Sequence, residues 1–286
     1  MLVAESLYET RSHVLSARRK GLSIGFVPTM GALHTGHLSL VAAARARHEF
    51  VVVSIFVNPT QFGPQEDLSR YPRPREQDLE LCREGGVDLV FYPQVMDMYP
   101  PGSCTTVHVA GLTDLWEGVI RPDHFRGVTT VVMKLFQIVP ADAAYFGQKD
   151  YQQQAVIRQM VRDLDLPIEI VTCPTVRDVD GLALSSRNAY LSAAERQAGL
   201  CLSQALKLGE AMYATGQSPI AISAAMQQHI QLEPGIKLDY AVVVDPGTLQ
   251  PLHVPQTDVV ALVAGRVGTT RLIDNARWKA LDSHPG

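Results

Sequence analysis

The chain has 286 residues, of which 46% are hydrophobic and 19% charged, and its formal net charge is -4. This composition excludes a disordered chain, and no run approaches the roughly 20 apolar residues that a membrane span needs. The slightly acidic balance also argues against a nucleic-acid binder with a broad basic face. We therefore expect a cytoplasmic globular protein with no membrane or nucleic-acid partner, and about 150 residues per domain predicts two domains.

The first 176 residues alternate strand-like apolar runs with helix-like segments. Strands are expected at 22–28, 50–58, 87–92, 143–146 and 168–176, and helices at 36–49, 73–84, 127–139 and 150–165. The run FVVVSIFVN at 50–58 is apolar on both faces, which is typical of parallel strands between two helix layers. The alternation predicts a doubly wound parallel sheet, an α/β fold, in a domain of residues 1–176.

The pattern changes after about residue 176. Two helices are expected at 192–215, with Ser192 as N-cap, and at 219–232, followed by strands at 238–245 and 259–264. This succession predicts a smaller α+β domain at residues 177–286. Residues 277–286 are expected to form a frayed tail.

The most informative segment is PTMGALHTGH, residues 28–37. It lies between the first expected strand and the first long helix, at the carboxyl end of a parallel strand, where open α/β sheets bind ligands. Its two glycines let the backbone approach a ligand, and the N-terminus of the following helix attracts anions. His34 and His37 are three residues apart, so one helical turn directs both imidazoles to the same place. The segment predicts a site for nucleotide phosphates, with both histidines as donors.

A metal site is the alternative interpretation of this histidine pair, because His-x-x-His can hold zinc. No Cys, Asp or Glu accompanies the pair nearby, and the four cysteines form no CxxC motif, so we favour phosphate and expect no protein-held metal. The sequence contains no Gly-Lys dipeptide, which excludes a P-loop, and no GxGxxG follows the first expected strand. A nucleotide would have to bind in another way.

Two further segments carry polar side chains where expected strands end. In NPTQFG, residues 58–63, the neutral amide of Gln61 can bond a hydroxyl or carboxylate without adding charge, although the segment also reads as a plain turn. In FGQKDYQQ, residues 146–153, Asp150 can cap a helix or bond a ribose and Lys149 can reach phosphates. Gln153 lies one helical turn beyond Asp150.

The segment LSSRN, residues 184–188, lies near the expected domain boundary. Its two hydroxyls and the guanidinium of Arg187 can hold a polyphosphate, because arginine bonds phosphate bidentately. An ordinary capping turn is the alternative. A small-domain loop that closes over a triphosphate would also exclude water from a reactive intermediate.

Seven motifs resemble, in order and spacing, those of the pantoate–β-alanine ligase family, the pantothenate synthetases. They are PTMGALHTGH (28–37), VNPTQFG (57–63), YPR (71–73), HFRGV (124–128), FGQKDYQQ (146–153), DGLALSSRN (180–188) and RLIDN (271–275). The resemblance covers about residues 1–277. The HxGH element alone is weak evidence, because nucleotidyltransferases and class I aminoacyl-tRNA synthetases share it, whereas seven motifs in register are specific.

The resemblance implies a Rossmann-like sheet of the HxGH nucleotidyltransferase type with a smaller C-terminal lid domain. It implies a magnesium-requiring ligase that condenses (R)-pantoate with β-alanine and consumes ATP. Pantothenate, AMP and pyrophosphate would form through a pantoyl adenylate, in pantothenate and coenzyme A biosynthesis. It also implies a homodimer.

The resemblance further assigns roles to individual residues. His37 would be the proton donor, with His34 beside it, and Gln61 would bind pantoate and β-alanine. Gln153 would bind pantoate. ATP would be contacted by Met30, Gly31, Ala32, Leu33, His34, Thr35, Gly36, His37, Gly147, Gln148, Lys149, Asp150, Val176, Leu184, Ser185, Ser186 and Arg187.

The chain departs from the family pattern at a few positions. Thr60 stands where Met is expected, Gln148 where many members have Glu, and Leu184 where some have Met. None of these departures removes a proposed catalytic group. HFRGV is left open between a role toward the substrate and a role in the fold, with the fold favoured.

Three other functions share part of this pattern. A nucleotidyltransferase that joins a nucleotide to a phosphorylated acceptor would share both histidines but would not need Gln61 and Gln153. A class I tRNA synthetase is disfavoured by the short second domain and the lack of a basic surface. A nucleotide-sensing module without catalysis is disfavoured because the histidines, Lys149 and Arg187 are all present.

Overall fold

The computed structural model describes residues 1–64 and 66–279, and the chain divides into two compact units. Unit 1 comprises Met1–Gln148 and Gln152–Pro174, and unit 2 comprises Lys149–Tyr151 and the chain from Thr175 onward. Among the helices of the described part, none is long and apolar enough to cross a membrane.

Unit 1 is built on a six-stranded sheet in the order β1-β4-β3-β2-β5-β6, in which every neighbouring pair is parallel. The strands are β1 (Leu2–Ala4), β2 (Ile24–Thr29), β3 (Phe50–Ile55), β4 (Leu89–Phe91), β5 (Ala143–Gly147) and β6 (Glu169–Cys173). The short edge strand β1 was not expected from the sequence. The other five strands were.

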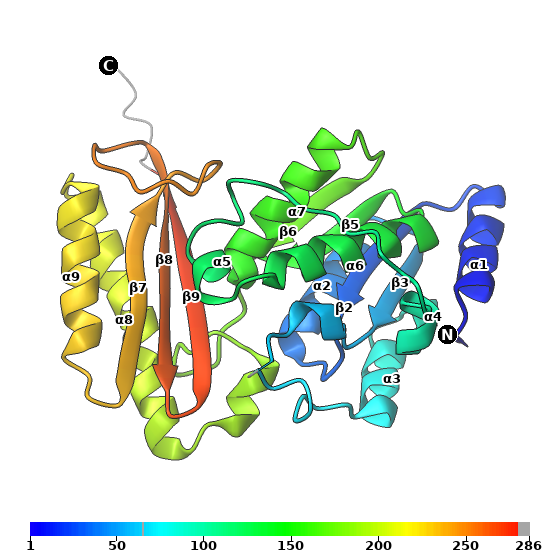
Figure 1. The fold of residues 1–286 in the computed structure, drawn as a ribbon, viewed down its shortest axis with the longest axis horizontal. Helices are drawn as coiled ribbons and strands as arrows, with labels where there is room; N and C mark the ends of the chain where they lie inside the picture. Colours follow the sequence, from blue (N-terminus) through cyan, green and yellow to red (C-terminus); the bar gives the residue numbers. More distant parts are fainter. Residues whose placement is uncertain (65, 280–286) are drawn as a thin grey trace. The chain divides into compact units, whose positions relative to one another are not determined.

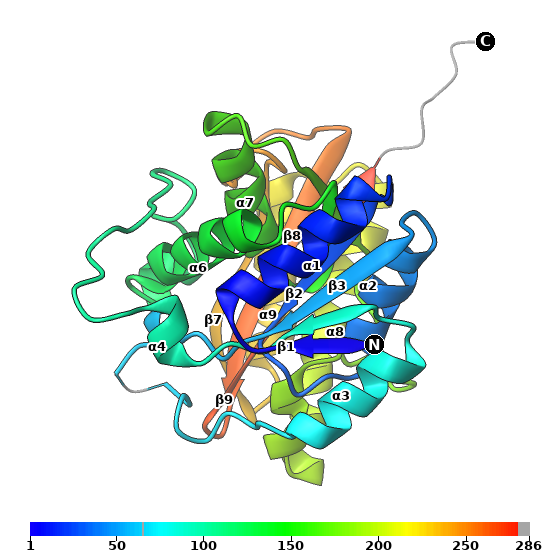
Figure 2. The same cartoon turned by 90° about the vertical axis from the view of Figure 1, so that its right-hand side faces the viewer.

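Helices cover both faces of this sheet. The helices between these strands are α1 (Leu7–Arg19), α2 (Thr35–Arg45), α3 (Arg75–Glu84), α4 (Val95–Met98), α5 (Glu117–Ile120), α6 (His124–Ile138) and α7 (Tyr151–Asp163). In Figure 2, α1, α6 and α7 lie on one face and α2 and α3 on the other, as right-handed crossovers in this strand order require. The doubly wound α/β fold is therefore confirmed.

The buried strands explain why the sheet needs both helix layers. In β3, Val51, Val52 and Val53 are all fully buried although successive side chains point to opposite faces. Only a sheet covered on both sides removes such a run from water, and each fully buried valine contributes about 1.5–3 kcal/mol relative to exposure.

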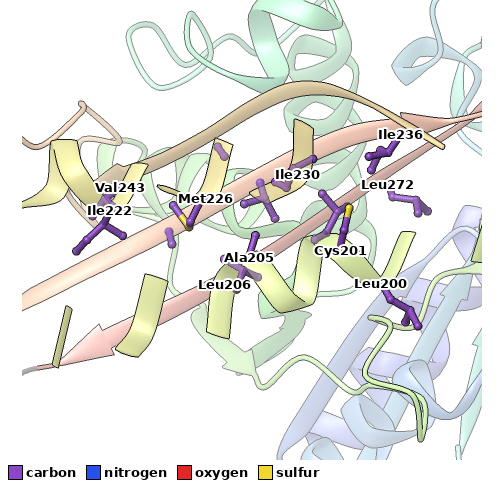
Figure 3. Close-up of a cluster of buried hydrophobic side chains, with 14 of the residues drawn as sticks. Leu200, Cys201, Ala205, Leu206, Ile222, Met226, Ile230, Ile236, Val243 and Leu272 are labelled. Atoms are coloured by element: carbon purple, nitrogen blue, oxygen red, sulfur yellow. The ribbon is translucent and has the colours of Figure 1, made fainter. Parts of the chain in front are cut away.

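Unit 2 packs two helices against a three-stranded antiparallel sheet (Figure 1). The helices are α8 (Ala193–Ala214) and α9 (Pro219–Gln231), and the strands are β7 (Ile236–Val244), β8 (Asp258–Val267) and β9 (Thr270–Lys279). Ser192 caps α8 as predicted, because its side chain accepts the Glu195 N–H. Figure 3 shows the core, where Met226 and Ile230 of α9 lie among buried residues of α8 and the sheet.

Strand β9 corrects the sequence prediction of a frayed tail from residue 277. Arg277–Lys279 belong to β9 and pair with β8, and Trp278 is only 3% exposed. Residues 280–286, the rest of the expected tail, lie outside the described residues.

Candidate functional site

The segments singled out in the first half of the sequence follow three neighbouring strands of unit 1. Residues 30–37 follow β2, the 3-10 helix Pro59–Gln61 follows β3, and Gly147 ends β5. β2 pairs with both β3 and β5, so all three segments lie at the carboxyl edge of the sheet. The chain leaves β2 toward α2 and β5 toward α7, on opposite faces (Figure 2). This is a topological switch point, where open α/β sheets bind ligands.

His34 and His37 cap helix α2 reciprocally. The Nδ1 atom of His34 accepts the Gly36 N–H at 3.1 Å, and the Nδ1 atom of His37 accepts the His34 N–H at 3.3 Å. The two imidazoles thus take the places that a serine and a glutamate occupy in an ordinary capping box. HTGH is therefore both a helix start and a pair of positioned rings.

The caps also fix which nitrogen of each ring carries the proton. A ring nitrogen that accepts a backbone N–H bears no proton, so each neutral imidazole of this pair carries its proton on Nε2. The ring centroids of His34 and His37 are 4.1 Å apart. The N-terminus of α2 thus presents two neighbouring Nε2–H donors, which suits an anion.

A buried carboxylate holds the loop that precedes the histidines. Asp78 of α3 is 1% exposed and accepts the N–H of Ala32 at 2.9 Å and of Leu33 at 2.7 Å. Gly31 and Ala32 have φ of +82° and +49°, so this loop adopts a left-handed path that local sequence disfavours for alanine. Burial raises the pKa of Asp78 above its usual value, although the two backbone hydrogen bonds partly oppose this shift.

Gln61 is 8% exposed, and its side-chain amide has a defined orientation. Its Oε1 accepts from Asn58 Nδ2 at 3.0 Å, and its Nε2 lies 3.0 Å from the sulfur of Met30. The Asn58 Oδ1 accepts from the hydroxyls of Thr60 and Tyr99, each at 2.9 Å. Thr60, which departs from the family pattern, therefore adds a bond to this network.

The backbone of Gln61 is held by a second set of polar groups. Its carbonyl lies 2.8 Å from His124 Nδ1 and 3.4 Å from Arg121 Nη2. Arg121 pairs bidentately with Glu66, at 2.7 and 2.6 Å, and its Nη1 lies 3.1 Å from His124 Nε2. Burial and the Arg121 charge lower the pKa of His124 to about 4.

The lowered pKa of His124 predicts acid-sensitive folding. Between pH 4 and 6.5, His124 is protonated in the unfolded chain but stays neutral in the folded chain. The free energy of unfolding therefore falls as pH falls. His124 alone should remove about 2 kcal/mol between pH 7.5 and pH 5. Urea unfolding at both pH values would measure this loss. The His124→Asn variant should show a shallower dependence, and an unchanged one would exclude His124 as the group responsible.

The remaining predicted residues belong to unit 2, except Gly147, Gln148 and Gln153. The Leu184 N–H donates to the Val176 carbonyl at 3.0 Å, so these two positions are neighbours across a turn. The Ser185 hydroxyl caps a 3-10 helix at Ser186–Tyr190 by accepting the Arg187 N–H. Ser185 therefore acts as a capping residue in this structure. The binding of phosphate by LSSRN stays a prediction.

The GQKD segment and the RLIDN motif meet within unit 2. Asn275 of β9 donates its side-chain amide to the Lys149 carbonyl at 2.8 Å. Its neighbour Asp274 accepts both guanidinium arms of Arg177, at 2.6 and 2.9 Å, beside Val176. RLIDN therefore binds the Lys149 carbonyl of one segment that the sequence assigns to ATP, and the side chain of Arg177 next to Val176. Gln153 is half-buried at the third position of α7 in unit 1.

Sequence reasoning missed Asp78, Asn58 and Arg121. A signal existed for Asp78, because it stands four residues before Cys82 on α3 and shares its buried face. An acidic residue in a buried helical stripe requires hydrogen-bond partners. No comparable pattern marks Arg121 or its partner Glu66, which are 55 positions apart in sequence.

Comparison with known proteins identifies the family. The family profile described as Pantoate-beta-alanine ligase matches residues 2–277. The chain is 54% identical over 276 residues to the pantothenate synthetase of Moorella thermoacetica, covering 96% of this chain and 98% of that protein. It is 52% identical over 287 residues to the pantothenate synthetase of Koribacter versatilis, covering 100% and 99% of the two chains.

Solved structures agree with the sequence relatives. A crystal structure of pantothenate synthetase from Thermus thermophilus has a TM-score of 0.91 and 48% identity, covering 96% of this chain and 99% of that chain. The Francisella tularensis pantoate-beta-alanine ligase, solved as a complex with β-γ ATP and β-alanine, has a TM-score of 0.80 at 35% identity and covers 96% and 97%. The expected resemblance is thus confirmed over the whole fold, and this chain belongs to the pantoate–β-alanine ligase family.

Proposed function

We propose that this chain is a pantoate–β-alanine ligase that works through the residues described above. The reaction condenses (R)-pantoate with β-alanine, consumes ATP and gives pantothenate, AMP and pyrophosphate. The observation that carries the proposal is the His34 and His37 pair, fixed by reciprocal caps at the start of α2 after β2, with the oriented amide of Gln61 after the neighbouring strand β3. The two histidines suit a phosphate, and the amide of Gln61 suits an oxygen of an acid or an alcohol.

In the first step, the pantoate carboxylate attacks the α-phosphorus of ATP and pyrophosphate leaves. The Nε2–H of His34 and of His37 would donate to phosphate oxygens, where negative charge grows in the transition state. His37 would act as the proton donor in its imidazolium form, in which Nδ1 carries a proton and no longer accepts the His34 N–H. Because Gln61 Oε1 is held by Asn58, Gln61 would offer its Nε2–H to an oxygen of pantoate.

In the second step, the β-alanine amine attacks the carbonyl carbon of the pantoyl adenylate and AMP leaves. Gln61 and Gln153 would hold the pantoyl group, and Gln61 would also contact β-alanine. The ATP contacts would come from residues 30–37, 147–150 and 184–187 and from Val176. In unit 2, the bonds of Asn275 to Lys149 and of Asp274 to Arg177 support the adenosine part of this assignment.

Magnesium would enter the reaction bound to ATP. Mg²⁺ retains several waters and is held mainly by substrate phosphates with few protein ligands. Across residues 1–64 and 66–279, no group of three or more His, Cys, Asp or Glu side chains is placed so that it could hold a metal ion. The ion would neutralise phosphate charge. Activity should disappear with a chelator and return with Mg²⁺, without a change in thermal stability.

Three further properties follow from the family resemblance. The chain would act as a cytoplasmic homodimer. Each subunit would have an ATP- and pantoate-binding domain at residues 1–176 and a C-terminal lid domain at 177–286. Sedimentation of the purified protein would test the dimer.

The function is tested by measuring AMP and pyrophosphate release from ATP, Mg²⁺ and (R)-pantoate, with and without β-alanine. Sustained AMP formation that requires both acids supports the ligase, and pantoate labelled with ¹⁸O in its carboxyl group should transfer one labelled oxygen to AMP. A requirement for a phosphorylated acceptor would instead indicate a nucleotidyltransferase. ATP binding without turnover on any acceptor would indicate a sensor.

A further inference from the structure

The HFRGV motif has no role in the reaction as described, yet it contacts the segment that carries Gln61. The His124 side chain and Arg121, three residues earlier, both reach the Gln61 carbonyl, at 2.8 and 3.4 Å. These groups lie 63 and 60 positions from Gln61 in sequence. Two cationic or polar side chains thus converge on one carbonyl oxygen of a residue proposed to bind substrate.

Arg121, His124 and the Gln61 carbonyl form a continuous chain of hydrogen bonds. Because the Gln61 carbonyl can only accept, His124 Nδ1 must donate to it, and the neutral ring then has a lone pair on Nε2. Arg121 Nη1 lies 3.1 Å from that Nε2 and can only donate. Every member of the chain from Arg121 through His124 to the Gln61 carbonyl is therefore satisfied, provided that His124 is neutral.

The guanidinium of Arg121 uses most of its N–H groups in bonds to other protein groups. Its side chain is 16% exposed, and Glu66, which it binds through two oxygens, is 24% exposed. A guanidinium bound at once to a carboxylate, an imidazole and a carbonyl has little capacity left for an anionic substrate. Its position indicates that it orients other protein groups.

Gly127 of the same motif brings helix α6 against the substrate segment. A Cβ atom at this position would lie 2.3 Å from the Thr60 carbonyl oxygen and 2.6 Å from the Gln61 nitrogen, so only glycine permits the contact. Asn58 spans the contact, because its Nδ2 donates both to the Gly127 carbonyl at 3.2 Å and to Gln61 Oε1 at 3.0 Å. The motif thus holds both the backbone and the side chain of Gln61.

We propose that Arg121 and His124 are positioning residues that set the orientation of Gln61 toward the acyl substrate. This inference rests on the proposed role of Gln61 in binding pantoate. HFRGV then serves the fold and the substrate together, because the contacts that seat α6 are the ones that fix the amide. Loss of these contacts should weaken use of pantoate more than use of ATP.

Two substitutions of His124 separate the hydrogen bond from packing. In His124→Leu, the donor to the Gln61 carbonyl is lost while the buried volume is largely kept. In His124→Asn, the amide Nδ2 can stand near the position of the ring Nδ1 and donate in its place. We expect kcat/KM for pantoate to fall about tenfold or more in His124→Leu, with KM for ATP changed less than about twofold, and His124→Asn to recover most of the loss.

Arg121→Lys keeps the positive charge but not the planar fork, and we expect the same selective loss. The matched control is Arg47→Lys, which alters an exposed bidentate pair with Glu169 in the same unit and should leave all kinetic constants unchanged. If His124→Leu fails to fold, Arg121→Lys gives the decisive result, because its substitution preserves the charge balance with Glu66.

Hydrogen exchange supplies a measurement that does not depend on the reaction. Amides of residues 57–63 should exchange faster in His124→Leu and Arg121→Lys, whereas those of β3 should not change. Faster exchange in a protein that never turns over pantoate would support positioning of this segment and refute the proposed function. Unchanged exchange and unchanged KM for pantoate would refute the inference. So would equal impairment of His124→Asn and His124→Leu, which would indicate packing alone.

Discussion

Replacing His37 by glutamine is expected to reduce AMP formation by a factor of about 10²–10⁴, the range typical of a lost general acid. The substitution is chosen because glutamine is an ordinary third residue of a capping box, so its Oε1 can accept the His34 N–H that His37 Nδ1 accepts now. Helix α2 should therefore begin as before. What disappears is the imidazole, because the glutamine amide can still donate a hydrogen bond but cannot give up a proton as a general acid.

Three measurements on the His37→Gln variant isolate the chemistry. Its thermal unfolding temperature should match that of the wild type, and its affinity for ATP should fall only slightly. Its kcat, in contrast, should fall by the factor given above. A variant that keeps its turnover would show that His37 serves only to cap the helix. If His37→Gln loses stability together with activity, loss of the helix cap would be enough to explain the loss of activity. In that case His37→Ala, which has no side chain to cap the helix, should lose still more stability.

Replacing Asp78 by asparagine is expected to lower kcat/KM for ATP by about 100-fold and the free energy of unfolding by about 2–4 kcal/mol. Both Asp78 oxygens accept backbone N–H groups, at 2.9 Å from Ala32 and 2.7 Å from Leu33. Asparagine has one acceptor oxygen, so its NH₂ would face one of these buried N–H groups as donor against donor. The left-handed path at Gly31 and Ala32 would lose its support.

The control for Asp78 is Glu80→Gln on the same helix. Glu80 is exposed and pairs with its neighbour Arg83 along α3, so its loss should cost less than about 0.5 kcal/mol and leave the kinetics unchanged. Steady-state kinetics and urea unfolding of both variants would provide the comparison. If Asp78→Asn keeps the wild-type KM for ATP, the loop is held without its carboxylate, and the structural argument for Asp78 is wrong.

The fold could be predicted from sequence largely because the sheet of unit 1 is buried on both faces. A strand such as β3 must then be a continuous apolar run, and such a run can be recognised in the sequence without knowing which strands pair with it. The alternation with helices fixes the layer order once crossovers are right-handed. Strand β9 was missed because its Asp274 and Asn275, 5% and 3% exposed, interrupt the apolar pattern.

The grouping of these candidate segments could also be predicted, because the carboxyl ends of parallel strands meet at one edge of the sheet. That argument brought residues 30–37, Gln61 and Gly147 together, and the structure places them at the carboxyl ends of the neighbouring strands β2, β3 and β5. The pair of histidines at a helix start could be recognised by its spacing alone. Their reciprocal capping could not, since histidine is an uncommon capping residue.

Sequence by itself determined what is local in this protein: the strands of unit 1 with apolar runs, the helix starts and the residues at each strand end. Only the tertiary structure decided the orientation of Gln61, the path of the loop before His34 and the strand character of residues 270–279. Each of these depends on a partner far along the chain: His124 for Gln61, Asp78 for Leu33 and β8 for β9. A buried polar group is stable only when such a partner satisfies it, and local sequence does not specify where that partner will come from.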